Sequence, residues 1–316
     1  MYTIAPLNIP QLLPEDKTRW YPLVKKQFWP CLDGKDPWGV INTVICALGA
    51  SYNGRPVGII LATLRKALGN AIILELNVEP DFRHQKIGTE LLTLFEAFLI
   101  EQKCTVVTYT YQSDLPTTIY LEKILQQLGW DEGKPFSVRC HFLSSKFSPE
   151  WVSKDYPLPK GFKIFKWKDL TLKERQQLES DLNKEMIPRS VSPFLRQETI
   201  EPSNSLGLKK NGEVIGWMIT NRISEDTIQY SSLFIKREYH FLGYAIYLLA
   251  ASILLQQKGT VENAFLDLNF QQVDHSWIHF VKKRLVPSSS LVERFKRSHH
   301  RIGNLYPTDE DEGRDF

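Results

Sequence analysis

The chain has 316 residues, a length that corresponds to about two domains of ordinary size. Hydrophobic residues make up 42% and charged residues 24%, a globular composition that excludes a largely disordered chain. The formal net charge of +3 is too small to indicate nucleic acid as the main partner. The longest apolar run, Ala245–Leu255, is too short for a bilayer, so no membrane span is expected.

The N-terminus and the cysteines bear on the compartment. The first residues lack a basic stretch followed by an apolar one, so no secretory signal is expected. The four cysteines lie far apart without a CxxC pair, whereas a disulfide framework or a zinc site favours clustered spacing. We therefore expect a cytoplasmic protein with reduced core cysteines and no metal.

Two segments predict the same β-hairpin. Residues 47–60 read ALGASYNGRPVGII and residues 205–218 read SLGLKKNGEVIGWM, and five of the fourteen positions are identical without a gap. Each segment holds an Asn-Gly pair between apolar runs, at Asn53 and at Asn211. Such a pair is typical of a type I′ turn, in which both central residues must accept a positive φ.

The elements that follow the two hairpins also match. After the first, Ala71–Val78 reads as a buried strand and Ile87–Ile100 as a helix with an apolar face. After the second, Thr227–Ile235 is the predicted strand and Tyr244–Leu255 the predicted helix. A hairpin, a strand, a turn and a helix thus occur twice, which predicts two similar α+β domains that arose by duplication.

The same pattern predicts the domain boundaries. We expect an N-terminal domain at 1–147 and a C-terminal domain at 161–305. Residues 148–160 are rich in proline and polar residues without periodicity, as in a linker. Residues 306–316 are acidic and have almost nothing to bury, so this tail is predicted to be disordered.

The turn after the first predicted strand has the character of a phosphate cradle. Leu76–Leu92 reads LNVEPDFRHQKIGTELL, a strand end, a turn and the start of a helix. The first helical turn leaves N–H groups unpaired, and the helix dipole favours negative charge there. Arg83, His84 and Lys86 add donors or positive charge, and Gly88 lets a ligand approach the backbone closely.

This segment resembles the acyl-CoA motif of the GNAT acyltransferase superfamily. That family carries R/Q-x-x-G-x-G/A between a strand and a helix, and the loop binds the pyrophosphate of coenzyme A (CoA). Arg83 and Gly88 match the first and last positions, whereas Lys86 stands in place of the middle glycine. The second half has His240 at the first position and keeps the glycine and alanine at Gly243 and Ala245.

Two partial matches behind equivalent hairpins make the chain resemble a tandem GNAT pair. The resemblance implies two αβα domains of the α+β class, each with a mixed, mostly antiparallel central sheet flanked by helices. It also implies acetyl-CoA or another acyl-CoA as co-substrate. The residues implied in contact with that co-substrate are Leu76, Asn77, Val78, Arg83, His84, Gln85, Lys86, Ile87, Gly88 and Thr89.

Acyl transfer to an amine requires a base, an N–H group facing the thioester oxygen, and an acid for the departing thiolate. Glu75 is the candidate base, because it precedes the stretch whose N–H group the resemblance assigns to the oxygen. Leu125 stands where the family has its tyrosine, so Tyr111 and Tyr120 are the candidate acids, with Tyr109 on the same strand face as Tyr111. The alternative is structural: a strand glutamate in solvent or in a salt bridge, and tyrosines that only pack.

The sequence therefore predicts an N-acyltransferase whose N-terminal half is catalytic. The acceptor is an amine-bearing small molecule or peptide, placed by the resemblance against Leu12–Trp38. Three alternatives remain open. The first is transfer from a long-chain acyl-CoA or an acyl-carrier protein to a peptide in a biosynthetic pathway, the second is a non-catalytic module that binds CoA or a peptide, and the third is catalysis in the C-terminal half. The oligomeric state is left open.

Overall fold

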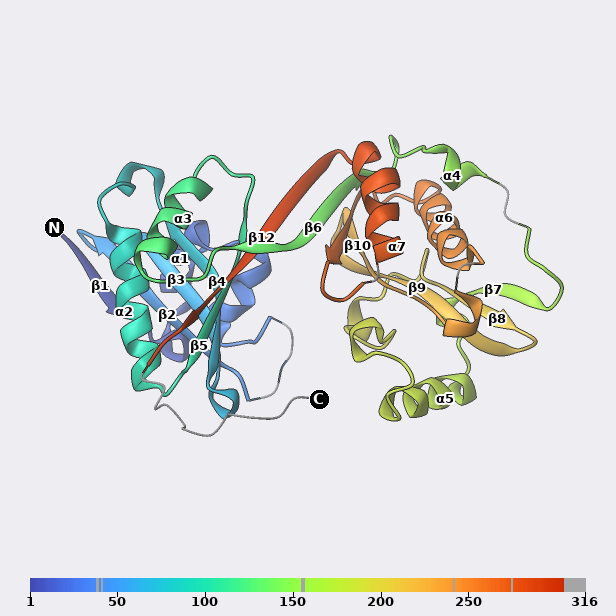
Figure 1. The fold of residues 1–316 in the computed structure, drawn as a ribbon, viewed down its shortest axis with the longest axis horizontal. Helices are drawn as coiled ribbons and strands as arrows, with labels where there is room; N and C mark the ends of the chain where they lie inside the picture. Colours follow the sequence, from blue (N-terminus) through green and yellow to red (C-terminus); the bar gives the residue numbers. More distant parts are fainter. Residues whose placement is uncertain (38–39, 41, 155–156, 241, 274, 304–316) are drawn as a thin grey trace, which may run out of the picture. The chain divides into compact units, whose positions relative to one another are not determined.

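The computed structural model describes residues 1–303 except 38–39, 41, 155–156, 241 and 274 (Figure 1). The predicted acidic tail lies outside the described residues. The chain divides into two compact units: unit 1 is Met1–Phe136 with the stretch that begins at Phe295, and unit 2 is Ser137–Arg294.

Unit 1 is a mixed sheet in which one neighbouring pair of strands, β4 and β5, runs parallel. The strands follow the order β1-β2-β3-β4-β5-β12, and the other described pairs are antiparallel. The bounds are β1 Tyr2–Pro6, β2 Val44–Tyr52, β3 Arg55–Arg65, β4 Asn70–Val78, β5 Val106–Gln112 and β12 Leu291–Arg301.

Helices and the N-terminal segment cover the two faces of this sheet. One face packs against α2 (Ile87–Glu101) and α3 (Thr118–Gln127), with Phe95 fully buried between helix and sheet (Figure 1). The other face packs against α1 (Pro14–Trp20) and the short helical turns that follow it, with Trp20 in the core. The expected αβα arrangement is confirmed for unit 1.

Unit 2 repeats this arrangement. Its strands follow the order β6-β11-β10-β9-β8-β7, and β10 and β11 are its parallel pair. The bounds in unit 2 are β6 Lys134–Leu143, α4 Glu150–Ser153, β7 Phe162–Lys166, α5 Leu172–Asn183, β8 Leu206–Lys210, β9 Glu213–Ser224, β10 Thr227–Ile235, α6 Tyr244–Gln257, β11 Asn263–Asn269 and α7 His275–Phe280.

Among the described helices of both units, none is long and apolar enough to cross a membrane.

Both predicted hairpin turns are confirmed. Asn53 and Gly54 have φ of 49° and 76°, and Asn211 and Gly212 have φ of 49° and 91°. A Cβ built on either glycine meets no atom within 4 Å. The backbone conformation, rather than crowding, therefore explains why glycine stands at the second position of each turn.

The units differ from the predicted domains because the two halves exchange a strand. In unit 1, β5 pairs with the end of the chain: Val106–Gln112 faces Phe295–Arg301 of β12, which Figure 1 shows in red beside green β5. In unit 2, β11 pairs with β6, which comes from the first half of the sequence. The predicted boundaries placed residues 137–147 and 295–303 in the opposite units, because strand pairing across such distances leaves no local pattern.

The predicted linker is also partly structured. Within 148–160, Glu150–Ser153 forms α4, and its Trp151 and Val152 are buried in the core of unit 2. Their burial makes this part of the segment a component of a domain rather than a spacer.

Candidate active site

The parallel pair in unit 1 separates part of the way along its length. β4 and β5 pair in register only over Asn70–Ile73 with Val106–Tyr109, although β4 continues to Val78 and β5 to Gln112. β4 stays bonded to β3 as far as Val78. The far part of β4 therefore has no strand partner on its β5 side, and a ligand in extended form can bond to the free backbone groups there.

A β-bulge sets the direction of the side chains at this point. In the pairing of β3 with β4, Leu61 faces Glu75 and Ala62 faces Ile73, so Leu74 is an extra residue. A bulge of this kind interrupts the alternation of faces and re-aims the next side chain. Leu74 packs with the N-terminal segment, and the Glu75 carboxylate accepts a hydrogen bond of 3.2 Å from the backbone N–H of Lys25 in that segment.

The carboxyl group of Glu75 is buried, and among the described residues no cationic side chain forms an ion pair with it. The residue is 6% exposed. Burial raises the pKa of the Glu75 carboxyl, and the charge of Lys25 and the hydrogen bond from its backbone oppose that effect without cancelling it. Asn77, two residues on, also faces the N-terminal segment and donates to the carbonyl of Leu23 at 3.1 Å. A base with a raised pKa thus lies beside part of the predicted acceptor region, Leu12–Trp38, of which Trp38 is outside the described residues.

Tyr109 lies near enough to Glu75 to be affected by its charge. It lies on β5 opposite Ile73, the last paired residue of β4, and is buried. Burial raises the pKa of the Tyr109 hydroxyl, and the charge of Glu75 raises it further, whereas a hydrogen bond from the backbone N–H of Leu76 lowers it. The Tyr109 hydroxyl therefore lies where the two strands separate, in reach of the Leu76 N–H.

Tyr111 and Tyr120 occupy other environments. The Tyr111 hydroxyl donates to the Glu122 carboxylate at 3.1 Å, and burial and Glu122 raise its pKa. Tyr120 is 49% exposed and packs edge-on against His84, with 4.7 Å between ring centroids. The structure thus places Tyr120 beside the cradle turn and Tyr111 beside α3.

The cradle turn has the backbone form of an anion site. The Arg83 Nε donates to the Val78 carbonyl at 2.9 Å, which ties the turn to the end of β4 and leaves the rest of the exposed guanidinium available. His84 and Lys86 have φ of 62° and 65°, with Gln85 at negative φ between them. Such alternation turns successive N–H groups toward one side.

The start of α2 continues this site. The N–H groups of Ile87, Gly88 and Thr89 find no acceptor among the described residues, as expected for a first helical turn. A Cβ on Gly88 would lie 3.8 Å from both Val78 and Ile124. Gly88 thus borders the space between the end of β4 and α3, and the end of the strand and the start of the helix come together as predicted.

The left-handed backbone explains why GNAT sequences favour glycine at the position of Lys86. Gly243, 157 residues further along, precedes α6 with φ of 79° in the same way that Lys86 precedes α2. An L-residue in this conformation costs roughly 1–2 kcal/mol.

We expect Lys86→Gly to raise the free energy of unfolding by about 1 kcal/mol and Lys86→Ala to leave it unchanged, as measured by urea denaturation. The reciprocal Gly243→Ala should destabilise the chain; equal stability of the two Lys86 variants would refute the assignment of strain.

Unit 2 shares the backbone of the site but not its chemistry. β10 and β11 pair only over Thr227–Tyr230 with Asn263–Leu266, and the bulge recurs beside Tyr230. The position of Glu75 is taken by Ser232, whose hydroxyl donates to the Val191 carbonyl at 2.7 Å. The position of Tyr109 is taken by Leu266. Unit 2 therefore lacks this acid–base pair.

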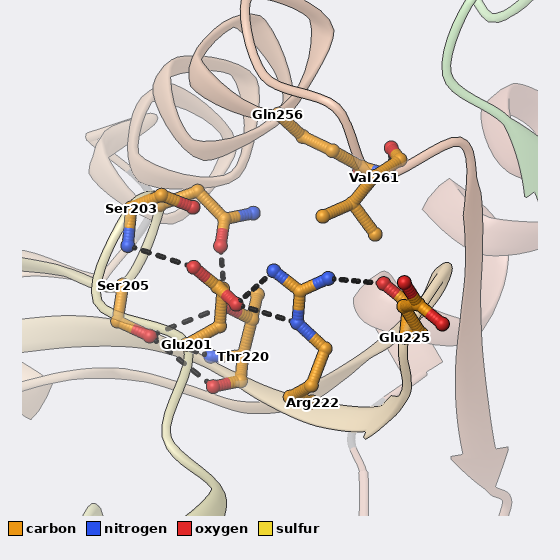
Figure 2. A network of polar contacts seen from close by, with 9 residues as sticks. Glu201, Ser203, Ser205, Thr220, Arg222, Glu225, Gln256 and Val261 are labelled. Atoms are coloured by element: carbon orange, nitrogen blue, oxygen red, sulfur yellow. Dashed lines mark hydrogen bonds and ion pairs between the residues drawn. The ribbon is translucent and has the colours of Figure 1, made fainter.

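The polar cluster of unit 2 at the start of β8 and the end of β9 has a structural role. Figure 2 shows Arg222 between Glu201 and Glu225. Arg222 pairs with the Glu201 carboxylate at 2.7 Å and donates to the Glu225 carbonyl at 2.7 Å. Burial tends to raise the pKa of Glu201, but the hydrogen bonds from Ser203 and the ion pair with Arg222 outweigh it and lower that pKa. The charges are mutually satisfied, and the described residues contain no group of three or more ligands suited to a metal.

A splayed strand pair with a helix N-terminus at its open end is the acyltransferase fold that the sequence resemblance implies. Residues 9–125 match the model of the acetyltransferase (GNAT) family. A tandem GNAT protein from the clavulanic acid biosynthesis pathway superposes with a TM-score of 0.66 at 15% identity, over 96% of this chain and all of the other. A GCN5-related N-acetyltransferase from Sphaerobacter thermophilus gives 0.64 at 14% identity, over 96% and 97%.

No curated protein matches the sequence significantly. The family model covers much of unit 1, and the structural likeness extends over both units. Residues 9–125 of this chain thus match the GNAT family model, and the fold over both units is like that of a tandem GNAT protein.

Proposed function

We propose that the chain is an acyl-CoA-dependent N-acyltransferase whose reaction takes place in unit 1. The observation that carries the proposal is the juxtaposition of Glu75, Tyr109 and the unpaired end of β4. A buried base, a buried hydroxyl and a backbone N–H meet where the strands separate. These are the three groups that acyl transfer from a thioester to an amine requires.

The co-substrate is assigned to the gap and the cradle. The pyrophosphate binds the N–H groups from Gln85 to Thr89 at the start of α2, assisted by Arg83, and His84 with Tyr120 borders the same turn. The pantetheine arm runs along Leu76, Asn77 and Val78, whose backbone has no strand partner on that side. Gly88 allows the arm to pass between β4 and α3.

The reaction is then an addition followed by an elimination. Glu75 accepts a proton from the acceptor amine, whose nitrogen bonds to the thioester carbon. A backbone N–H of the unpaired end of β4, other than the Leu76 N–H that reaches Tyr109, stabilises the oxygen that gains charge. The carbon–sulfur bond breaks, and Tyr109 gives its proton to the departing thiolate. Protonation of Glu75 removes the charge that raises the pKa of Tyr109, so the first proton transfer prepares the second.

Calorimetric titration with acetyl-CoA, and with a long-chain acyl-CoA, tests the cradle. We expect one site per chain and at least tenfold weaker binding in Gly88→Leu, because the new side chain fills the gap beside Val78 and Ile124. Ala245→Leu, the equivalent change in unit 2, is the matched control and should bind normally. Loss of binding in Ala245→Leu alone would move the site to unit 2.

Activity and binding assays on the same protein distinguish the alternatives. Turnover with either acyl-CoA supports the enzyme, and binding without turnover of any amine supports a non-catalytic CoA module. Absence of binding to both donors contradicts the proposed co-substrate and leaves an acyl-carrier protein as donor.

A further inference from the structure

The two exchanged strands carry the same pair of basic residues. In β12, Arg297 and His299 face Thr110 and Thr108 of β5. In β6, Arg139 and His141 stand in the same register beside β11. Each unit thus presents an arginine and a histidine, two residues apart, on one face of its sheet.

In unit 2 both basic residues are paired with carboxylates. Arg139 bonds Asp267 through two nitrogens, at 2.6 and 3.0 Å. The His141 Nε2 lies 2.7 Å from a Glu293 carboxylate oxygen. Little positive charge is left for a ligand on this face of unit 2.

In unit 1 the residues that face Arg297 and His299 are threonines, and Thr110 stands where unit 2 has Asp267. The Arg297 Nε donates to Thr110 Oγ1 at 2.8 Å, and its guanidinium carbon lies 3.3 Å from the ring centre of Phe136. The His299 Nδ1 lies 3.0 Å from Thr108 Oγ1. No carboxylate pairs with Arg297 in the described part of the chain.

The remaining charges near these residues are mainly positive. Burial lowers the pKa of the Arg297 guanidinium, and no acidic group opposes that effect. Burial, Arg297 and Lys134 lower the pKa of His299, against the opposite influence of Asp131. A half-buried arginine that keeps its terminal nitrogens free is suited to bidentate binding of a carboxylate or phosphate.

Arg297 and His299 lie on the same sheet face as the proposed base. Tyr109 and Tyr111 point into the core beneath α2 and α3, so Thr108 and Thr110 point to the opposite face. Leu74 and, after the bulge, Glu75 are on that opposite face, against the N-terminal segment. β12 is two strands from β4, a backbone separation of at least about 10 Å where β4 and β5 have separated.

We propose that Arg297 and His299 form an anion-binding subsite for the acceptor, so that unit 1 acylates amines that also carry a carboxylate or a phosphate. The inference deepens the proposed function and rests on it. The acceptor amine lies at Glu75, and the anionic group lies at β12. The free pair occurs in the unit that holds Glu75 and Tyr109, and the neutralised pair in the unit that lacks them.

Binding of a probe tests the subsite without any reaction. We expect 8-aminooctanoate to bind the wild-type chain in calorimetric titration, and Arg297→Gln to weaken it about tenfold or more. Arg139→Gln is the matched control and should bind as the wild type does. Arg297→Lys keeps the charge but loses the two parallel N–H donors of the guanidinium, so its affinity should lie between those of the wild type and Arg297→Gln. Equal melting temperatures of all variants verify that they fold. Undiminished binding in Arg297→Gln, or none in the wild type, overturns the subsite.

Kinetics with matched amines completes the test. With acetyl-CoA, kcat/KM should favour 8-aminooctanoate over the uncharged 8-aminooctanamide by about tenfold or more, and Arg297→Gln should abolish the preference. A higher kcat/KM for 8-aminooctyl phosphate than for 8-aminooctanoate identifies a phosphate acceptor, and the reverse a carboxylate. If no amine is acetylated but anion binding still depends on Arg297, the proposed function fails and the subsite stands. An equal preference in wild type and Arg297→Gln contradicts the subsite.

Discussion

Glu75→Gln lowers kcat for acyl transfer by about 10²–10³-fold and leaves the Kd for acetyl-CoA unchanged, because a general base is lost while the cradle is intact. In the wild type, kcat/KM falls as the pH drops through the Glu75 pKa, which burial holds above its ordinary value of 4.5. In Glu75→Gln this acidic limb disappears. The measurement is a steady-state pH profile of both proteins with one amine acceptor.

Glu122→Gln is the matched control for a carboxylate in the same unit. Glu122 accepts hydrogen bonds from Tyr111 and Lys296 and has no place in the proposed reaction. Its variant should keep kcat within about twofold and retain the acidic limb. Loss of activity in Glu122→Gln with normal activity in Glu75→Gln would contradict the role of Glu75 and would assign the acid–base chemistry to the surroundings of Tyr111.

The same Glu75→Gln substitution should stabilise the folded chain at neutral pH. A raised folded pKa means that the protonated carboxyl contributes stability below the unfolded pKa, and that this contribution is lost as the pH rises through the folded pKa. The amide of the variant resembles the protonated carboxyl at every pH. Its advantage over the wild type should therefore be present at pH 7 and vanish below about pH 4. Equal stability at pH 7 would show that Glu75 carries no burial cost.

Removal of β12 should unfold unit 1. A chain that ends at Ser290 loses the strand that pairs with all of β5, including the fully buried Ser298. Tyr109 and Val107 would then lie next to an open edge. We expect a loss of at least about 5 kcal/mol, which is comparable to the whole stability of many domains.

Truncation after Gly303 is the control, because it retains all of β12. Circular dichroism melting and acetyl-CoA titration of the two truncated chains give the comparison. If the chain that ends at Ser290 melts and binds acetyl-CoA as the wild type does, unit 1 does not depend on the exchanged strand.

The sequence predicted the parts of this protein that short spacing controls. The hairpins around Asn53 and Asn211, the strand before the cradle and the helix after it follow from turn chemistry and from periodicities of two and 3.6 residues. The cradle was found for the same reason, since a strand end, a turn and a helix start are contiguous. The repeat then extended the fold from unit 1 to unit 2.

The choice among tyrosines depended on the tertiary structure. Tyr109 and Tyr111 are two residues apart and point to the same face of β5, so no local sequence pattern distinguishes their surroundings. The pairing of β4 with β5 ends at Tyr109, and the hydroxyl of Tyr111 is taken by Glu122. The point at which two strands separate is a property of their pairing, so only the fold assigns the two side chains to different environments.

The exchanged strands show the same limit on a larger scale. Arg297 and Thr110 are 187 residues apart in the sequence, yet their hydrogen bond belongs to one unit. The Arg-x-His spacing of β6 and β12 is visible in the sequence, but whether a carboxylate or a threonine faces it depends on which strand lies alongside. The sequence by itself determined the local elements, the duplication and the resemblance to the GNAT family, because these follow from contiguous residues. The tertiary structure decided which strands each unit contains, the different environments of Tyr109 and Tyr111, and the absence of a carboxylate partner for Arg297 among the described residues, because strand pairing brings together residues that have no local relation.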